Sequence, residues 1–272
     1  MKNKIFIIML MFFSITLFSC SGNKEKNALD TIKEKGKIIL AVSPDYPPYE
    51  FYSSNDGKKE IIGADLFLAQ KIADGLGVEL EIQEMAFDSL LAAVSSGRCD
   101  MAISGINPNE QRRKAVDFSD VYFTGKSIFL IKKDADDITS EDYFKSDKVK
   151  VGVQKGSIQE KLAKEALNMK DSNIQALSDV PNLLQELKNK RIDVVILGED
   201  VAKIAAAKDS SIKISSFAAS QDDEQLGMAI AFKKGNDNES LLVEVNKVIS
   251  EIKEKDEFSK ELDKFAKIAA KN

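Results

Sequence analysis

The sequence predicts an α/β protein built from two similar units, each with a mostly parallel sheet. Apolar strand-like runs alternate with helical segments along the chain, which is typical of parallel strands joined by crossover helices. Two stretches also resemble each other, because each holds a Leu-Leu pair, a polar break, an aspartate (Asp100 or Asp193) and an apolar strand: "DSLLAAVSSGRCDMAIS" and "VPNLLQELKNKRIDVVIL". A duplication and the common pattern of α/β proteins explain this likeness equally well. The 272 residues suffice for one large or two modest domains.

The first 20 residues (1–20) are predicted to be a secretory signal. Lys2 and Lys4 precede an apolar run, Ile5–Phe18, that is too short for a comfortable membrane span. The run ends in "LFSC", which resembles the lipobox of bacterial lipoproteins and implies that Cys20 is acylated. A simple secreted protein with a cysteine near its cleavage site is the alternative. We expect residues 21–27 to form a flexible tether, since their polar composition cannot collapse into a core.

Residue spacing and turn residues predict the elements of the first unit. Ala28–Lys35 is expected to be a helix that stops at Gly36, followed by the buried strand "KIILAV". The prolines of "SPDYPPYEF" predict a loop, because proline removes backbone donors, and "SNDGKK" predicts a turn. Glycines bound the helical pattern "GADLFLAQKIADGLG", and "VELEIQEM" alternates as a strand does. A helix over "FDSLLAAVSSGRCD", capped by Asp88, and the strand "MAIS" complete the unit.

The second half repeats this order, and two segments are expected to cross between the units. Val121–Ile131 leaves the first unit, and Gln225–Phe232 lies where the chain could return. Two crossings would form a hinge over a cleft. Two long helices, Glu239–Lys255 and Glu257–Ala270, finish the chain and need partners for their apolar faces.

Composition excludes several functions. The sequence has no histidine, which rules out Ser-His-Asp and Cys-His catalysis and histidine-rich metal sites. It has no Walker loop or complete dinucleotide fingerprint, and we expect no metal and no cofactor. The acidic run Gln221–Gln225 fits a solvated loop better than a calcium site. Without Lys2 and Lys4, 37 basic and 44 acidic residues remain, and this excess of acids argues against nucleic acid as a partner. Cys99 fits a buried small hydrophobe better than a reactive thiol.

Arg112 is the cation that most needs an explanation. With Asn109 as N-cap, Arg112 and Arg113 fall in the first turn of a helix, where cations oppose the macrodipole by about 0.3–1 kcal/mol each. Arg113 can pair with Asp117 four residues on, but Arg112 has no acid at that spacing. The preceding turn supplies a hydroxyl, an amide and backbone N–H groups at the end of a strand, where open α/β sheets bind ligands. These donors and a guanidinium would form a carboxylate site, although a surface arginine is the simpler reading.

Five stretches resemble the bacterial extracellular solute-binding proteins of family 3, the polar amino acid binding lipoproteins of ATP-driven (ABC) importers. The likeness spans nearly all of Ala28–Lys271, in order and at family spacing. The stretches are "SPDYPPYEF", the run from "IGADLFLAQ" to "KAVDFSDVYF", "VKVGVQKGSIQEKL", "RIDVVILGEDVA" and "LGMAIAFKKGN". The resemblance implies a type II periplasmic-binding-protein-like fold with a two-strand hinge and a cleft. Lobe 1 would hold residues 28–126 and 226–272, and lobe 2 residues 127–225.

The resemblance also implies a set of ligand-binding residues. Arg112 would bind the α-carboxylate of an amino acid with help from Ser104, Gly105 and Asn107. Ser157, in the "QKGS" loop, would add a hydroxyl at a helix N-terminus. The remaining expected residues line the side-chain pocket, with the specificity-setting position first: Ser43, Tyr46 and Phe87. From the sequence alone, Tyr46 and Phe87 would be assigned to the core.

One position departs from the family pattern. An aspartate that pairs with the ligand's α-ammonium usually follows the strand "VVIL", and here that position is Gly198. A buried ammonium group without an anion would be costly, so we expect Glu199 to take this role through a shifted loop. The alternative is a ligand that lacks a standard α-amino group.

These expectations describe a monomeric receptor outside the cytoplasm, anchored by lipid to the membrane in the periplasm or at the cell surface. It would capture a free, polar or charged amino acid by lobe closure and present it to the permease subunits of an ABC importer, without catalysis. The rivals are a cyclohexadienyl-dehydratase-like enzyme, which would use the same arginine, and a sensory module for a signalling partner. The sequence leaves open which amino acid is bound and which membrane carries the anchor.

Overall fold

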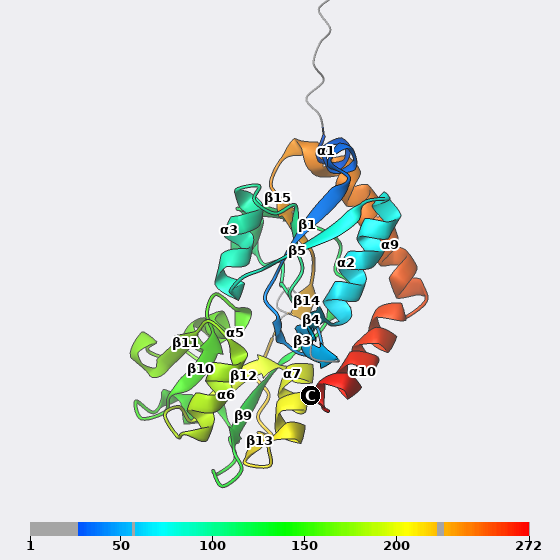
Figure 1. Cartoon of the computed structure of the whole chain (residues 1–272). Coiled ribbons are helices and arrows are strands. Elements are labelled where there is room, and N and C mark those ends of the chain that lie inside the picture. The colour runs from blue at the N-terminus through cyan, green and yellow to red at the C-terminus, as the bar shows by residue number, and fades with distance from the viewer. Residues whose placement is uncertain (1–26, 56–57, 222–225, 272) are drawn as a thin grey trace, which may run out of the picture.

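The computed structural model describes residues 27–55, 58–221 and 226–271, which form the two lobes of Figure 1. The predicted signal, Cys20 and most of the predicted tether lie outside the described residues, as does most of the acidic run after Gln221. Each lobe holds a five-stranded mixed sheet, so the predicted α/β class with two lobes is confirmed. Within the described ranges, no helix is both long and apolar enough to cross a membrane.

In the sheet of lobe 1, strand β1 lies between two parallel neighbours. The strand order is β5 (Glu79–Glu84), β1 (Lys37–Val42), β6 (Met101–Ala102), β15 (Ala231–Lys233) and β7 (Val116–Phe118). Strands β5, β1 and β6 are parallel, and β15 runs antiparallel to both of its neighbours, β6 and β7. Helix α2 (Ala64–Leu76) and the C-terminal helices cover one face, and α3 (Leu90–Ser95) covers the other. Because both faces are covered, β1 reads as a continuous apolar run rather than an alternating one.

Lobe 2 repeats this arrangement. Its order is β11 (Ile174–Leu177), β10 (Val151–Gln154), β12 (Val194–Gly198), β9 (Ser127–Lys132) and β13 (Ile212–Ile214), again two parallel pairs followed by two antiparallel pairs. Its helices are α5 (Ile158–Lys161), which continues as the π-helical turn η3 (Leu162–Ala166), α6 (Val180–Lys188) and α7 (Glu199–Lys208). The 3₁₀ turns η2 (Glu141–Lys145) and η4 (Asp171–Asn173) connect them.

The two aspartates matched in the sequence have the same structural role. The carboxylate of Asp100 accepts the N–H of Ile39 at 2.7 Å, and that of Asp193 accepts the N–H of Lys150 at 2.8 Å. Each aspartate precedes the central strand of its lobe, β6 or β12, and joins it to the neighbouring parallel strand, β1 or β10. The likeness of the two stretches thus extends to hydrogen bonding, whatever its origin.

Two short segments connect the lobes. Strands β8 (Phe123–Thr124) and β14 (Gly227–Met228) pair antiparallel, and the chain passes from one lobe to the other beside them. A separate three-stranded sheet of β2 (Asp45–Tyr46), β3 (Glu50–Asn55) and β4 (Lys58–Ile62) lies next to this crossing (Figure 1). The predicted loop at Ser43–Phe51 therefore contains one short strand and the beginning of another.

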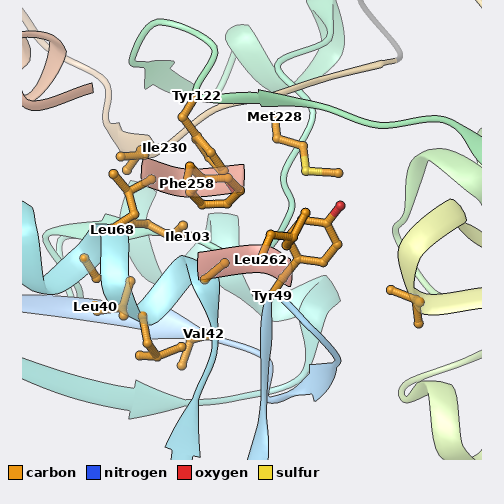
Figure 2. Packing of buried hydrophobic residues seen from close by; sticks show 14 of the residues in the cluster. Leu40, Val42, Tyr49, Leu68, Ile103, Tyr122, Met228, Ile230, Phe258 and Leu262 are labelled. Atoms are coloured by element: carbon orange, nitrogen blue, oxygen red, sulfur yellow. The ribbon is translucent and has the colours of Figure 1, made fainter. Parts of the chain in front are cut away.

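The core runs from lobe 1 past the crossing. Figure 2 shows Tyr49, Tyr122, Met228 and Phe258 gathered beside the apolar side chains of the lobe 1 sheet. The last two helices, α9 (Glu239–Glu254) and α10 (Glu257–Ala269), pack on α2, as their apolar faces require. Helix α10 then continues along the side of the molecule to α7 of lobe 2 (Figure 1).

Local details differ from expectation near the crossing of the lobes. Asp88 does not cap a helix, because it lies in the 3₁₀ turn η1 (Phe87–Ser89) and pairs with Lys155 of lobe 2 at 2.8 Å. The helix ends predicted from glycines are confirmed: α1 (Ala28–Lys35) ends at Gly36, which adopts φ of 70°, and α2 lies between Gly63 and Gly77. The one-turn helix α4 (Glu110–Arg113) and the 3₁₀ turn η5 (Asn236–Asn238) complete lobe 1.

Candidate ligand-binding site between the lobes

A cavity lies between the lobes beside the β8–β14 crossing. The space between its atoms amounts to about 430 Å³, including its opening to solvent. Six of the nine expected residues line it: Tyr46, Phe87, Ser104, Gly105, Asn107 and Ser157. Side chains that sequence reasoning did not single out also line it, among them Lys126, Gln154, Gln159 and Met228. The structure thus brings residues of both lobes to one space.

Ser43 and Glu199 do not line this cavity. Ser43 faces a separate surface hollow, where its hydroxyl donates to Asp45 Oδ1 at 2.9 Å. Glu199 lies 3.5 Å from the Nζ of Lys126 and 3.0 Å from that of Lys203, near the surface. Partial burial acts to raise the pKa of its carboxyl group, but the two lysines together outweigh it and hold this pKa below the usual range. The position expected to receive an ammonium group is therefore already paired.

Arg112 lies between the two lobes, where it lines a hollow next to the cavity and not the cavity itself. Its side chain is 9% exposed, and the adjoining hollow that it lines shares Ser157 with the cavity. Nη1 donates to the carbonyl of Asn107 at 2.8 Å, and Nη2 donates across the cleft to that of Gly156 at 2.9 Å. The guanidinium carbon lies 5.6 Å from the centre of the Phe87 ring.

No carboxylate of the described residues pairs with Arg112. Burial alone lowers the pKa of its guanidinium to about 10, which leaves the group charged at neutral pH. Two of the five N–H donors of a guanidinium are satisfied here by carbonyl oxygens, which carry no net charge. Removing a cation from water without a counter-ion is costly. Arg112 is thus a buried cation at the lobe interface that lacks an anion.

The sequence argument was right about the N-cap of the helix that holds Arg112 and wrong about the length of that helix. Asn109 is the N-cap, and its side chain accepts the N–H of Arg112 at 2.9 Å, as predicted. However, α4 ends at Arg113, so a macrodipole of one turn adds little. The predicted pair of Arg113 with Asp117 is not formed, because the helix does not extend to Asp117. Arg113 instead donates Nε to the carbonyl of Pro108 and lies over the Phe118 ring.

Gly198 meets Tyr46 across the cleft. The N–H of Gly198 donates to the Tyr46 hydroxyl at 2.8 Å, and a Cβ at position 198 would lie 2.8 Å from that oxygen. The tyrosine hydroxyl thus occupies the space that a side chain at 198 would need. Burial raises the pKa of Tyr46 above its usual value, so the hydroxyl keeps its proton.

Two buried carboxyl groups lie behind the cavity floor, and sequence reasoning missed both. Ser104 donates its hydroxyl to Glu50 Oε1 at 2.5 Å, and the N–H of Gly105 donates to Asp65 Oδ2 at 2.9 Å. Burial raises the pKa of Asp65 to about 6 and that of Glu50 well above its usual value. Since both donors are engaged, neither the Ser104 hydroxyl nor the Gly105 N–H is available to a ligand carboxylate, contrary to expectation.

Several hydrogen bonds join the lobes around the cavity. Oδ2 of Asp45 accepts from Gln154 Nε2 at 3.0 Å and from the N–H of Val180 at 2.8 Å. The Tyr49 hydroxyl donates to Asp200 Oδ2 at 2.7 Å. With the Arg112–Gly156 bond, these contacts mean that the structure has the closed arrangement of the lobes.

Two similar α/β lobes, a two-strand crossing and a polar cavity between the lobes define a two-lobe ligand-binding protein. Comparisons with known proteins specify its family. The model of the bacterial extracellular solute-binding proteins, family 3, matches residues 38–268. The arginine-binding extracellular protein ArtP of Bacillus subtilis (strain 168) is 31% identical over 260 residues, or 96% of each chain. A probable histidine-binding protein of Campylobacter jejuni is 30% identical over 254 residues, or 93% of this chain and 94% of that one.

A solved structure gives the same result. An amino acid ABC transporter substrate-binding protein of Streptococcus pneumoniae Canada MDR_19A, bound to L-arginine, has a TM-score of 0.82 and 35% identity. The match covers 89% of this chain and 98% of that one. The chain belongs to the bacterial extracellular solute-binding proteins, family 3, and is an amino acid binding protein of the ABC transporter type. The predictions of the family, and of a binding protein rather than an enzyme, are confirmed.

Proposed function

We propose that the protein captures a free polar amino acid by lobe closure, with Arg112 binding the α-carboxylate, and delivers it to a membrane permease. The observation that carries this proposal is the buried guanidinium of Arg112, which bridges the lobes and has no counter-anion in the part of the chain that the structure describes. A carboxylate is the anion that a planar guanidinium binds best, because the two groups can form parallel hydrogen bonds. The ligand would supply the missing negative charge.

The N-terminus of α5 supports the same position for the carboxylate. Ser157, Ile158 and Gln159 begin this helix and line the cavity. The first N–H groups of a helix have no acceptor within the helix, so at this short helix hydrogen bonds rather than a macrodipole would hold the carboxylate. The Ser157 oxygen already accepts the N–H of Glu160 at 3.2 Å, which leaves its proton for donation. A carboxylate between Arg112 and this helix would contact both lobes and so stabilise the closed form.

The rest of the cavity fits a polar side chain. Tyr46 and Phe87 offer aromatic surface, and Asn107, Gln154 and Gln159 add amide groups to the lining. The relatives named above bind arginine and, in one case, probably histidine, so these are the first ligands to test. Ser43 lies behind this surface and acts on it through its N–H, which donates to the Ser104 oxygen at 3.2 Å.

A thermal-shift and calorimetric screen of residues 28–272 against free amino acids tests the proposal. An amino acid at a hundred times its Kd should stabilise the wild type by about 2.7 kcal/mol. Arg112→Ala should abolish this stabilisation, and Arg112→Lys should weaken binding at least tenfold, because an ammonium cannot form the two parallel bonds. The matched control is Arg113→Ala, since Arg113 contacts Pro108 and Phe118 instead. Wild-type binding by Arg112→Ala would refute the carboxylate assignment.

A further inference from the structure

The carboxyl pair behind the cavity floor is the most unusual group of charges in the described structure. Glu50 and Asp65 are both fully buried, and their carboxyl groups are close enough for the charge of Asp65 to raise the pKa of Glu50. Tyr122 adds a hydroxyl, which lies 3.0 Å from one Asp65 oxygen and 3.1 Å from the other. Glu50 Oε2 faces no donor among the described residues. One proton on Glu50, shared with Asp65, would satisfy both carboxyl groups, so that the pair carries one negative charge.

No cation of the described residues balances this charge. The groups that act most strongly on the pair are Asp45, the Ser104 hydroxyl, the Gly105 N–H and the Tyr122 hydroxyl, and none of them is a lysine or arginine. On its other sides the pair faces Tyr49, whose hydroxyl is bonded to Asp200. A buried negative charge without a partner is costly for the same reason as the charge of Arg112.

Ser104 and Gly105 separate the pair from the cavity and contact both. Each lines the cavity, and each donates a hydrogen bond to one of the carboxyl groups. The Ser104 oxygen accepts the N–H of Ser43 and has a second lone pair. A cationic donor in the cavity could use that lone pair, in a chain that ends on Glu50. Such a chain strengthens each of its hydrogen bonds.

We propose that the Glu50–Asp65 pair is the counter-charge for the ligand's α-ammonium group and acts on it through Ser104. This inference rests on the proposed amino acid receptor function. It assigns the ammonium to the floor of lobe 1, whereas Glu199 is paired with two lysines. Glu50 and Asp65 are therefore positioning and specificity residues that do not touch the ligand. They favour amino acids over carboxylic acids that lack an amino group.

The test compares each amino acid with the same acid lacking its α-amino group. The probes are L-arginine with 5-guanidinopentanoate, and L-histidine with 3-(imidazol-4-yl)propanoate, measured by calorimetry. We expect the wild type to prefer the amino acid of at least one pair by 100-fold or more. Glu50→Gln and Asp65→Asn should each keep this preference within about threefold, because the remaining carboxyl group takes the negative charge. The double variant removes the charge and should lower the preference to less than tenfold.

The pattern of outcomes separates this inference from the proposed function. A purely structural role would weaken both members of a probe pair equally, with losses that add from single to double variant. A double variant that keeps the wild-type preference would overturn the inference, as would a wild type that binds the deaminated acids equally well. Neither result would affect the assignment of Arg112 to the ligand's α-carboxylate. A wild type that binds no free amino acid would overturn the proposed function and this inference together.

If the double variant does not fold, the pH dependence of ligand binding by the wild type tests the inference instead. L-arginine keeps its charges between pH 5.5 and 7.5. The Glu50–Asp65 pair, in contrast, binds its second proton near pH 6, so that it is mostly neutral at pH 5.5. Wild-type affinity for L-arginine should therefore fall about fourfold from pH 7.5 to 5.5, while that for 5-guanidinopentanoate stays nearly constant. Equal pH dependence of the two probes would contradict the inference. Loss of the pH dependence in Glu50→Gln, where one carboxyl group remains, would contradict it too.

Discussion

Asp45→Ala should weaken ligand binding without destabilising the ligand-free protein. Asp45 belongs to lobe 1, yet its Oδ2 accepts hydrogen bonds from two groups of lobe 2, Gln154 Nε2 and the N–H of Val180. Val180 is the first residue of α6, so the carboxylate also lies at the N-terminus of a nine-residue helix. These contacts form only when the lobes close. Their loss therefore makes lobe closure less favourable, and this weakens the measured affinity for the ligand.

The size of this effect follows from two opposing terms. Hydrogen bonds to a charged group contribute about 1.5–3 kcal/mol each, and the helix terminus adds about 0.3–1 kcal/mol. Burial opposes them and is the largest influence on this carboxyl group, since it raises the pKa of Asp45 despite the hydrogen bonds. We therefore expect a net loss of about 1–2 kcal/mol, or a five- to thirtyfold weaker affinity.

Calorimetry measures this loss, and small-angle scattering with and without ligand follows the closure. The matched control is Asp88→Ala, which removes another contact between the lobes, the pair with Lys155 at 2.8 Å. The lysine side chain of that pair is 60% exposed, and exposed pairs contribute about 0–1 kcal/mol. The control should thus weaken binding less than fivefold. Equal effects of the two variants, or an Asp45→Ala affinity within threefold of wild type, would refute this account of closure.

Two further predictions concern single positions. Gly198→Ala places a methyl group 2.8 Å from the Tyr46 hydroxyl, so affinity should fall at least tenfold while the ligand-free melting temperature stays constant. Combining it with Tyr46→Phe relieves the clash and should restore part of the affinity, and no recovery would argue against this contact. If Cys20 is acylated as the sequence predicts, cells fed radioactive palmitate should label the wild type and keep it in the membrane fraction. Cys20→Ser should be unlabelled and released, and labelling of that variant would contradict the proposed anchor.

The sequence predicted those features that depend on neighbouring residues. Glycine stops, helical spacing and strand alternation located α1, α2 and β5, because each signal lies within one element. The prediction for Arg113 failed where it assumed a longer helix: α4 has one turn, and the spacing that would join Arg113 to Asp117 does not exist beyond it.

Contacts between distant elements could not be predicted in this way. Asp45 and Val180 are 135 positions apart, and their hydrogen bond depends on how the lobes are placed. Glu50 and Asp65 gave no signal either, because an acid in a strand and an acid in the first turn of a helix are both ordinary on a surface. Only the packing of β3 against α2 shows that these two carboxyl groups are buried together.

The two proposals combine into one account of why the lobes close on a zwitterion. The closed protein buries a cation, Arg112, on one side of the cavity and a negative carboxyl pair, Glu50 and Asp65, behind its floor. Each charge is costly alone, and the two do not pair with each other. An amino acid carries the opposite charges on two groups bonded to the same carbon and would neutralise both. Closure without a ligand would lack this gain, so the charges that bind the amino acid also make closure depend on it.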